Sequence, residues 1–431
     1  MVSHVFVVDS ERKPLNPVHP GRARRLLTDG KAAVLRRFPF TIILKVAVPD
    51  AQTDPLRVKI DPGSKTTGLA RVNDVSGDVV WAAELSHRGQ QIVQNLDDRR
   101  MYRRSRRQRH TRSRQPRFDN RRRSAGWLPP ALESRITNVV TWVQRLHRYA
   151  PLAALSQELT KFDTQALQNP EISGVEYQQG TLAGYELRAY LLEKWERRCA
   201  YCRRADLPLQ VEHIVPKARG GSTRVSNLTL ACETCNQQKG TQTAEEFDFP
   251  DLHKQAQKPL KDAAALNATR WALFRRLQTA SLLVETGTGG RTKWNRTQRG
   301  IPKTHWCDAA CVGSSTPQAV RWQPIAPLLI VATGWQRRQM CLMDAYGFPR
   351  TKAKKQSRIQ GFKTGDIVRA VVPTGVKGGT YVGRVAVRAN ASFNITAVAG
   401  VVQGIPARAC SAIHRQDGYR YEKGVALAPQ A

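Results

Sequence analysis

Hydrophobic positions along the chain follow two different periods, and together they predict a mixed α/β protein. Apolar residues recur every three or four positions over residues 131–149, which is the spacing of an amphipathic helix. Three β-like runs between residues 57 and 85, separated by the turn sequences PGSK and NDVSGD, predict an antiparallel meander. The run PLAALSQEL at 151–159 predicts a short buried strand that ends in an acid.

The two ends of the chain carry patterns of their own. The first fifty residues predict a strand, a helix and further strands in a small basic α/β unit punctuated by Pro and Gly. Residues 182–198 and 263–280 have helical character, and the run SLLVE after the second of these predicts another strand. From about residue 335 to 420, short runs rich in Gly and Val predict a small β-rich barrel. We therefore expect a multidomain α/β protein.

Net charge narrows the choice of partners. The 431 residues include 69 Lys and Arg against 34 acids, a net charge of +35. Self-repulsion on that scale destabilises a compact chain unless a polyanion neutralises it, so a nucleic acid is the expected partner and an anionic membrane the main alternative. Because no run approaches eighteen apolar residues and the N-terminus lacks a signal-peptide pattern, we expect a soluble, cytoplasmic protein with no membrane partner.

Four of the eight cysteines form two CxxC pairs that predict a metal site. Cys199 and Cys202 precede Cys232 and Cys235, with 29 residues between the pairs. Two such knuckles can offer four thiolates tetrahedrally to zinc, and a site with four thiolate ligands has no open position for water. The zinc is therefore expected to be structural. The alternative is two unrelated CxxC turns.

The segment between and after these pairs resembles the HNH nuclease motif. It contains Glu212-His213 at the end of a strand, a Gly-Gly loop, Asn227, and a helix that carries Asn236. The resemblance implies that His213 is a general base, that Glu212 and Asn236 bind one Mg²⁺, and that Asn227 supports the loop. A near-neutral imidazole can deprotonate water at physiological pH, and Mg²⁺ prefers oxygen ligands. In this sequence Asn replaces the second His of the motif and Glu stands where Asp is common. A non-catalytic zinc ribbon is the alternative.

Three acids far apart in the sequence form a second candidate site. Asp61 ends one apolar strand, Glu158 ends another, and Asp308 lies three residues after His305 in KTHWCDAACVG. This pattern resembles the RuvC nuclease, which has an RNase H-like fold. The resemblance implies that the three carboxylates hold two Mg²⁺ (or Mn²⁺) ions, which activate water and stabilise the departing oxygen, and that His305 assists proton transfer or positions the water. Taken singly, each acid is equally typical of a turn or a strand end.

The order of these segments resembles the IscB family, the transposon-encoded relatives of the RNA-guided type II CRISPR effectors. KPLNPVHPGRARRLL stands where that family has its PLMP motif, with Asn16 in place of Met, and RTKWNRTQRGIPKTHWCDAACVG and DGYRYEKG fit its later segments. The resemblance implies an RNase H-like fold split by an arginine-rich bridge helix and by a ββα-metal HNH insertion. The implied divisions are an N-terminal domain (1–55), RuvC-I (56–98), the bridge helix (99–125), RuvC-II (126–185), HNH (186–250), RuvC-III (251–334) and a C-terminal β-rich domain (335–431).

The family resemblance also implies an activity and partners. It implies an Mg²⁺-dependent DNA endonuclease, guided by a structured RNA as a monomeric ribonucleoprotein, that cuts the target strand of double-stranded DNA with HNH and the non-target strand with RuvC. The C-terminal domain would read a short motif beside the target and contact RNA. Two alternatives stay open: a protein-guided homing or junction-resolving endonuclease, and a nuclease-dead RNA chaperone or regulator.

Residues 99–123 contain thirteen arginines and one acid, and they predict a helix up to about Gln115, before Pro116. Their guanidinium groups can fork onto phosphates and read the geometry of an RNA-containing duplex, while base pairing carries the sequence information. The alternative is a solvated charged face. The candidate nucleic-acid contacts are Arg99, Arg100, Arg103, Arg104, Arg106, Arg107, Arg109, Arg112 and Arg114.

Overall fold

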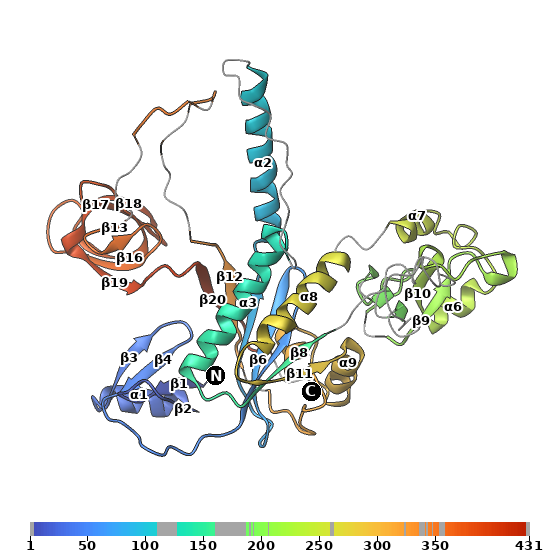
Figure 1. The fold of residues 1–431 in the computed structure, drawn as a ribbon, viewed down its shortest axis with the longest axis horizontal. Coiled ribbons are helices and arrows are strands. Elements are labelled where there is room, and N and C mark those ends of the chain that lie inside the picture. Colours follow the sequence, from blue (N-terminus) through green and yellow to red (C-terminus); the bar gives the residue numbers. More distant parts are fainter. Residues whose placement is uncertain are drawn as a thin grey trace.

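The structure is a computed structural model that describes residues 4–109, 127–159, 187–188, 191–192, 194–205, 207–258, 263–322, 325–335, 341, 344–346, 348–352 and 358–427. Part of the predicted arginine helix, residues 110–115, lies outside the described residues, as do residues 182–186, 189–190 and 193 of the helix predicted over 182–198. Elsewhere, four folded units can be followed in Figure 1: an N-terminal unit, a central sheet with its helices, a cysteine-containing unit and a C-terminal β-rich unit.

A seven-stranded sheet forms the centre of the protein, in the order β11-β8-β5-β6-β7-β12-β20. Its strands are β5 (Leu56–Asp61), β6 (Thr66–Asn73), β7 (Val79–Ser86), β8 (Ala154–Glu158), β11 (Leu283–Gly287), β12 (Leu328–Ala332) and β20 (Tyr419–Lys423). Strands β5, β6 and β7 form the predicted antiparallel meander. Strands β8 and β11 extend it in parallel on one side, and β12 pairs in parallel with β7 on the other. One sheet therefore gathers segments from most of the chain.

Helices cover both faces of this sheet. The amphipathic helix predicted over 131–149 is confirmed as α3 (Pro130–Tyr149), and α8 (Ala263–Gln278) lies beside it in the same core. In that core, the Trp142 ring of α3 stacks on Trp81 of β7 with 6.1 Å between centroids. On the other face, α10 (His305–Ala310) packs against β5 and β6, with α9 (Gly289–Gln298) next to it. Burial on both faces explains the nearly continuous apolar runs of the central strands.

The N-terminal unit has the predicted α/β character and one additional strand. Its elements are β1 (Val5–Val8), β2 (Pro14–Val18), α1 (Pro20–Thr28), β3 (Ala32–Arg36) and β4 (Thr41–Leu44), with strand order β2-β1-β4-β3. The sequence PLNPV of β2 contains two prolines, which argue against a strand in the middle of a sheet. Because β2 lies at the edge, it tolerates the missing N–H donors.

The cysteine-containing unit has the predicted ββα arrangement. It comprises β9 (Leu209–His213), short 3-10 turns at Lys217–Arg219 and Val225–Asn227, β10 (Leu228–Cys232), α6 (Glu233–Lys239) and α7 (Asp251–Gln257). β9 and β10 pair with each other and with no strand of the central sheet. A separate apolar core surrounds them, so this unit is an insertion that carries its own stabilising contacts.

The C-terminal unit is an open antiparallel sheet. It contains the hairpin β13 (Arg358–Ile359) and β14 (Phe362–Lys363), then β15 (Ile367–Val372), β16 (Gly379–Ala386), β17 (Ser392–Ala397), β18 (Gly400–Pro406), a 3-10 turn at Ala407–Ala409, and β19 (Cys410–His414). The order β18-β17-β16-β15-β19 leaves both end strands unpaired with each other among the described residues, so the expected barrel is not closed. The chain then returns to the central sheet, where β20 pairs with β12.

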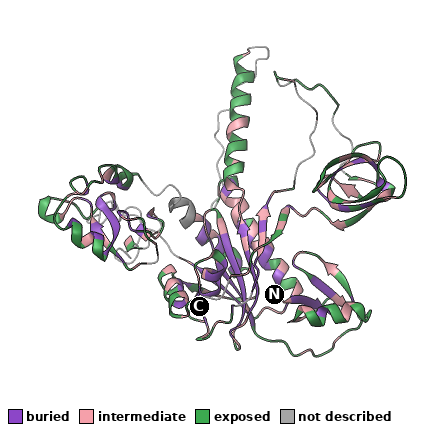
Figure 2. Cartoon of the chain, turned by 180° about the vertical axis from the view of Figure 1, so that it is seen from behind, coloured by how far each residue is buried: buried purple, intermediate pink, exposed green. Residues whose placement is uncertain are grey.

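Helix α2 (Gly89–Gln108) contacts α3 but contributes no residue to any buried core. It begins ten residues before the arginine run, spans 20 residues and buries none of them. Figures 1 and 2 show it projecting from the central sheet with a mostly exposed surface. Tertiary packing usually supplies most of a helix's stability, so α2 is expected to gain stability from a partner. Among the described residues, no helix combines the length and apolar character needed to cross a membrane.

Candidate functional site

Two of the three predicted acids lie at neighbouring strand ends. Asp61 is the last residue of β5 and Glu158 the last of β8, and these strands are parallel with Ile60 opposite Gln157. The carboxyl ends of parallel neighbours meet at one edge of a sheet, so the strand pairing itself brings the two carboxylates together. The third, Asp308, lies on α10, which packs on β5 and β6.

A glycine lets α10 come close enough to complete the group. Gly68 of β6 stands opposite Asp61 in the strand register. A Cβ atom at this position would lie 1.8 Å from the carbonyl oxygen of His305, at the start of α10. Only a residue without a side chain therefore allows the backbone of α10 to rest on β6 and Asp308 to reach the site.

The three carboxylates influence one another electrostatically. Burial raises the pKa of Asp61 well above its usual range, and the charges of Glu158 and Asp308 raise it further. Burial also raises the pKa of Asp308, which the neighbouring Arg296 partly offsets. Their oxygens are not all within 4.8 Å of one another, unlike the sulfur atoms of the cysteine quartet. Such concentrated negative charge, carried on hard oxygen ligands, fits a divalent cation.

Two arginines on the neighbouring helices, one buried and one half-buried, contact the acids, and no local pattern in the sequence singles them out. Arg270 of α8 is 6% exposed; its Nη2 lies 3.3 Å from Glu158 Oε1, and its Nε donates to the Pro62 carbonyl. Arg296 of α9 places Nε 2.9 Å from Asp308 Oδ1. In a sequence, arginines on such helices are typical of solvent-exposed positions, so no local signal reveals these contacts.

His305 begins α10 and is exposed at the rim of this group. Its backbone N–H donates to Glu84 Oε1 at 3.2 Å, and Thr304 caps the helix by accepting from the Cys307 N–H. Glu84 faces Gly68 across the β6–β7 pair, so a further acid lies beside the predicted three. Glu84 has no signal of its own in the sequence, because it lies within an apolar run that predicts only a strand.

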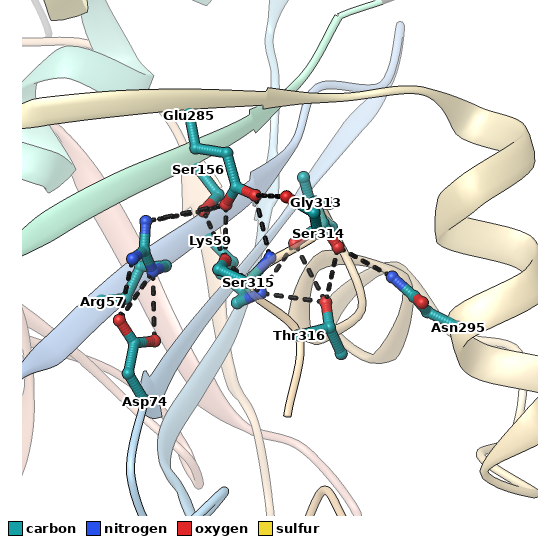
Figure 3. A network of polar contacts seen from close by, with 11 residues as sticks. Arg57, Lys59, Asp74, Ser156, Glu285, Asn295, Gly313, Ser314, Ser315 and Thr316 are labelled. Carbon is teal, nitrogen blue, oxygen red and sulfur yellow. Dashed lines mark hydrogen bonds and ion pairs between the residues drawn. The ribbon is translucent and has the colours of Figure 1, made fainter. Parts of the chain in front are cut away.

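A buried polar network fixes the loop that follows α10 (Figure 3). Glu285 of β11 accepts hydrogen bonds from Ser156 Oγ at 2.5 Å and from the Ser315 N–H and Oγ at 2.9 and 2.5 Å. Burial alone would raise its pKa, but these hydrogen bonds outweigh burial and hold the pKa of Glu285 at about 2. The carboxylate is therefore charged and ties β8, β11 and the loop together.

A buried lysine completes that network. Lys59 of β5 donates from Nζ to the Val312 carbonyl at 2.7 Å and to Thr316 Oγ1 at 3.0 Å. Burial lowers the pKa of Lys59 to about 8, although the charge of Glu285 opposes the shift. Because Lys59 and Asp61 are two residues apart on one strand, they lie on the same face of the sheet. The network therefore anchors the segment directly after the helix that carries Asp308.

The four predicted zinc ligands come together. The Sγ atoms of Cys199, Cys202, Cys232 and Cys235 lie within 4.8 Å of one another, and among the described residues no other group of three or more His, Cys, Asp or Glu side chains does so. All four are free thiols, with 3.8 Å between the sulfurs of Cys202 and Cys232. Four mutually close thiols are the donor set of a structural zinc site.

His213 and Asn227 lie on either side of the β9–β10 turn. His213 pairs with Leu228 across the two strands, and its Nε2 has no hydrogen-bond partner among the described residues. Burial, followed by the charge of Lys217, lowers its pKa, so the imidazole is neutral near pH 7. Asn227 accepts from the Val215 N–H at 2.9 Å and donates to the Val215 and Ser222 carbonyls, so it fixes the loop between the strands.

Glu212 is more enclosed than its expected role suggests. It is 7% exposed, and its Oε1 lies 2.6 Å from Lys239 Nζ while its Oε2 accepts from the Tyr201 hydroxyl at 2.7 Å. Lys239 is itself fully buried and also donates to the His213 carbonyl. Asn236, one turn earlier on α6, donates to Gln210 Oε1 at 2.7 Å. No local pattern in the sequence singles out Lys239 or Tyr201 as partners of Glu212.

The described candidate arginines of the nucleic-acid interface all lie on or directly after α2. Six are exposed, and Arg109 is half-buried where it contacts Tyr346 and Phe348. Arg112 and Arg114 lie outside the described residues. Within the described part of the chain, Asp97 of α2 forms an ion pair with Arg100 at 3.4 Å. The helix therefore presents a strongly positive surface.

Two family models match the chain. Residues 5–180 match the family described as RRXRR protein, and residues 199–251 match the family described as HNH endonuclease. The chain carries an HNH endonuclease domain. Together these matches confirm the resemblance to the IscB-like RuvC/HNH nucleases, and they support a nuclease. The cysteine quartet, His213 and Asn236 all lie within the matched HNH segment.

Solved structures similar to this chain include Cas9 proteins. Streptococcus thermophilus Cas9 in complex with the AGAA PAM matches with 14% identity and a TM-score of 0.22, over 59% of this chain and 32% of that one. The type II-C Cas9 enzyme from Actinomyces naeslundii matches with 18% identity and a TM-score of 0.16, over 46% of this chain and 33% of that one. The chain thus spans about a third of the length of these proteins. None of the curated proteins matches.

Proposed function

We propose that this chain is an RNA-guided DNA endonuclease with two metal-dependent centres, one of the RuvC type and one of the HNH type. The observation that carries the proposal is the assembly of Asp61, Glu158 and Asp308, from three distant segments, beside an independently folded HNH domain. In this interpretation the central sheet is the RNase H-like RuvC fold. It is divided by the arginine helix and by the HNH insertion.

In the RuvC centre, Asp61, Glu158 and Asp308 are the proposed ligands of Mg²⁺ or Mn²⁺. The bound metals would supply an activated water and would stabilise the departing oxygen of the phosphodiester. The residues of the chain orient this site: Arg270 and Arg296 hold two of the carboxylates by charge-assisted contacts. The exposed His305 is placed to position the water or to carry its proton away.

In the HNH centre, His213 is the proposed general base. An imidazole that is neutral near pH 7 can accept a proton from water, and its buried Nε2 has no hydrogen-bond partner among the described residues. Glu212 and Asn236 are the proposed ligands of one Mg²⁺. A carboxylate offers about four lone-pair sites, so Glu212 can keep Lys239 and Tyr201 as partners and still contact a cation. The four cysteines are proposed to bind a structural zinc that holds β10 and α6 in place.

RNA guidance is supported by charge and by the form of α2. A polyanion that stays bound would neutralise the net charge of +35 and would stabilise a projecting helix that has no buried residue. The guanidinium groups of α2 would contact phosphates, and base pairing between guide RNA and target strand would supply specificity. The C-terminal unit within residues 335–431 is proposed to contact RNA and to read a motif beside the target.

The test is strand-resolved cleavage by the protein purified with RNA from its own locus. Asp61→Ala should abolish cutting of the non-target strand only, and His213→Ala cutting of the target strand only. Either variant leaving both strands cut would disprove the assignment of that centre. Cleavage that survives complete RNase digestion would instead favour a protein-guided endonuclease.

A further inference from the structure

A pocket of about 310 Å³ lies between α2 and the turn at residues 344–346. Its helical wall includes Asp98, Tyr102, Arg106 and Arg109, which recur at intervals of three and four residues and so share one face of α2. Tyr346 forms the opposite wall. The volume is at the lower end of the range for small-molecule sites, which suits a single planar group.

The turn that carries Tyr346 is held in place at both ends. Asp344 Oδ1 accepts hydrogen bonds from the backbone N–H groups of Tyr346 and Phe348, at 3.0 and 2.7 Å. Arg109 donates to the Tyr346 carbonyl, and its guanidinium carbon lies 5.3 Å from the centroid of the Phe348 ring. These contacts fix the wall against the C-terminal end of α2.

The aromatic side chains of the pocket are exposed. Tyr102 is 64% exposed and Tyr346 is 71% exposed. Exposed aromatic rings interleaved with arginines are the combination on which unpaired nucleobases stack, because every base has a π-face and every arginine can contact its phosphate or stack on it. The chemistry of these walls therefore favours a base over an apolar peptide side chain.

The one acid of the pocket distinguishes a base from a phosphate. Asp98 accepts from Gln94 Nε2 at 3.1 Å and keeps further acceptor positions. A carboxylate repels a phosphate but accepts hydrogen bonds from base N–H groups. Guanine presents two such donors on its Watson–Crick edge, and adenine presents one amino group there. The pocket therefore suits guanine best.

We propose that this pocket binds one unpaired guanine base of the guide RNA, stacked between Tyr102 and Tyr346 with its N–H edge toward Asp98. The inference rests on the proposed function, and it adds a base-specific contact to the phosphate contacts of α2. RNA is chosen over DNA because α2 buries none of its 20 residues and is expected to need a partner that stays bound between rounds of cleavage.

The test measures fluorescence anisotropy of the full chain with ten-nucleotide single-stranded oligomers at one fixed salt concentration. The probes are an all-uridine RNA, the same RNA with one central guanosine or one central adenosine, and a DNA version with one central deoxyguanosine in thymidines. We expect the guanosine RNA to bind several-fold more tightly than the all-uridine RNA. Tyr102→Ala should weaken the guanosine RNA by about tenfold.

Matched variants separate stacking from edge recognition. Tyr102→Phe keeps the ring and should retain the affinity, and Asp98→Asn should remove the preference for guanosine over adenosine. Thermal melting checks that each variant is folded. Equal affinities for the guanosine and all-uridine RNAs, or equal weakening of both by Tyr102→Ala, would overturn the pocket while leaving the proposed function intact. If Tyr102→Ala weakened binding of the DNA probe as much as binding of the guanosine RNA, the choice of RNA over DNA would be overturned.

Photocrosslinking of the purified ribonucleoprotein gives an independent measurement. Irradiation at 254 nm followed by peptide mapping should find a guanosine adduct at Tyr102 or Tyr346. An adduct map with contacts on other peptides and none at these two would contradict the pocket. If no RNA copurifies and no RNA oligomer binds, the proposed function fails together with the inference.

Discussion

Gly68→Ala should inactivate one nuclease centre without touching any of its three carboxylates. The added Cβ would lie 1.8 Å from the His305 carbonyl oxygen, whereas ordinary contact begins at 3.4 Å. Both partners are backbone on β6 and α10, so no flexible side chain can move aside. The first turn of α10 must shift by about 1.6 Å, and Asp308 moves with it.

A displacement of that size predicts a large effect on the rate. Misplacement of a catalytic group by about 1 Å can cost roughly 100-fold, because the reacting atoms must be held in line. We therefore expect the non-target strand to be cut at least about 100-fold more slowly under single-turnover conditions. Target-strand cleavage should be unchanged, since the ββα unit has its own core and does not depend on α10.

The assay follows both labelled strands of one DNA duplex in the same reaction. Gly89→Ala is the matched control, because its Cβ would come no closer than 3.7 Å to any neighbouring atom. It should leave both rates unchanged. Non-target cleavage by Gly68→Ala within twofold of wild type would refute the argument that close approach of α10 builds the site. Loss of both activities would indicate general misfolding and would refute the claimed independence of the two centres.

Four further outcomes are expected. Lys239→Met should lower the free energy of unfolding of the HNH unit by about 3 kcal/mol in urea titrations, because Glu212 stays buried without its cationic partner. Glu285 has a pKa of about 2, so the stability that its charged form contributes is present above pH 4.5 and is lost as the pH falls toward 2. After allowing for solvent screening, Glu285→Gln should lower the free energy of unfolding by about 1–2 kcal/mol at pH 7 and leave it unchanged near pH 2. Cys232→Ser should remove the bound zinc in elemental analysis and abolish target-strand cutting only. Asp61→Asn should raise the melting temperature while non-target cutting is lost, because burial and two neighbouring carboxylates disfavour the ionised form of Asp61 and an amide cannot ionise.

Local patterns predicted the parts of the fold that depend on local chemistry. The helical periodicity of α3 follows from its single buried face, and the apolar runs of β5 to β7 follow from burial on both faces of the sheet. These elements therefore lie where the sequence predicts them. The meeting of Asp61 and Glu158 also follows, because acids at the ends of parallel neighbours share an edge. The CxxC spacing likewise identified the cysteine quartet.

Contacts between residues far apart in the sequence could not be predicted from local patterns. Lys59 and Lys239 are fully buried, but a lysine in a sequence is typical of the surface until its partners are known. Arg270 contacts Glu158, which lies 112 residues away in the sequence, and no local spacing predicts this contact. The return of β20 to the central sheet is likewise a pairing choice that its own sequence does not specify.

The buried acids of the two proposed centres share a feature that these contacts reveal. Glu158, Asp308 and Glu212 each have a basic partner within 3.3 Å, supplied by a helix other than the element that carries the acid. Among the described residues, Asp61 has no ion-pair partner, and its pKa is raised well above the usual range. These arginine and lysine side chains thus offset part of the repulsion among the carboxylates and hold three of the acids in place. The raised pKa means that Asp61 keeps its proton to a higher pH than a free carboxyl group does, and a divalent cation that displaced this proton would stabilise the charged carboxylate.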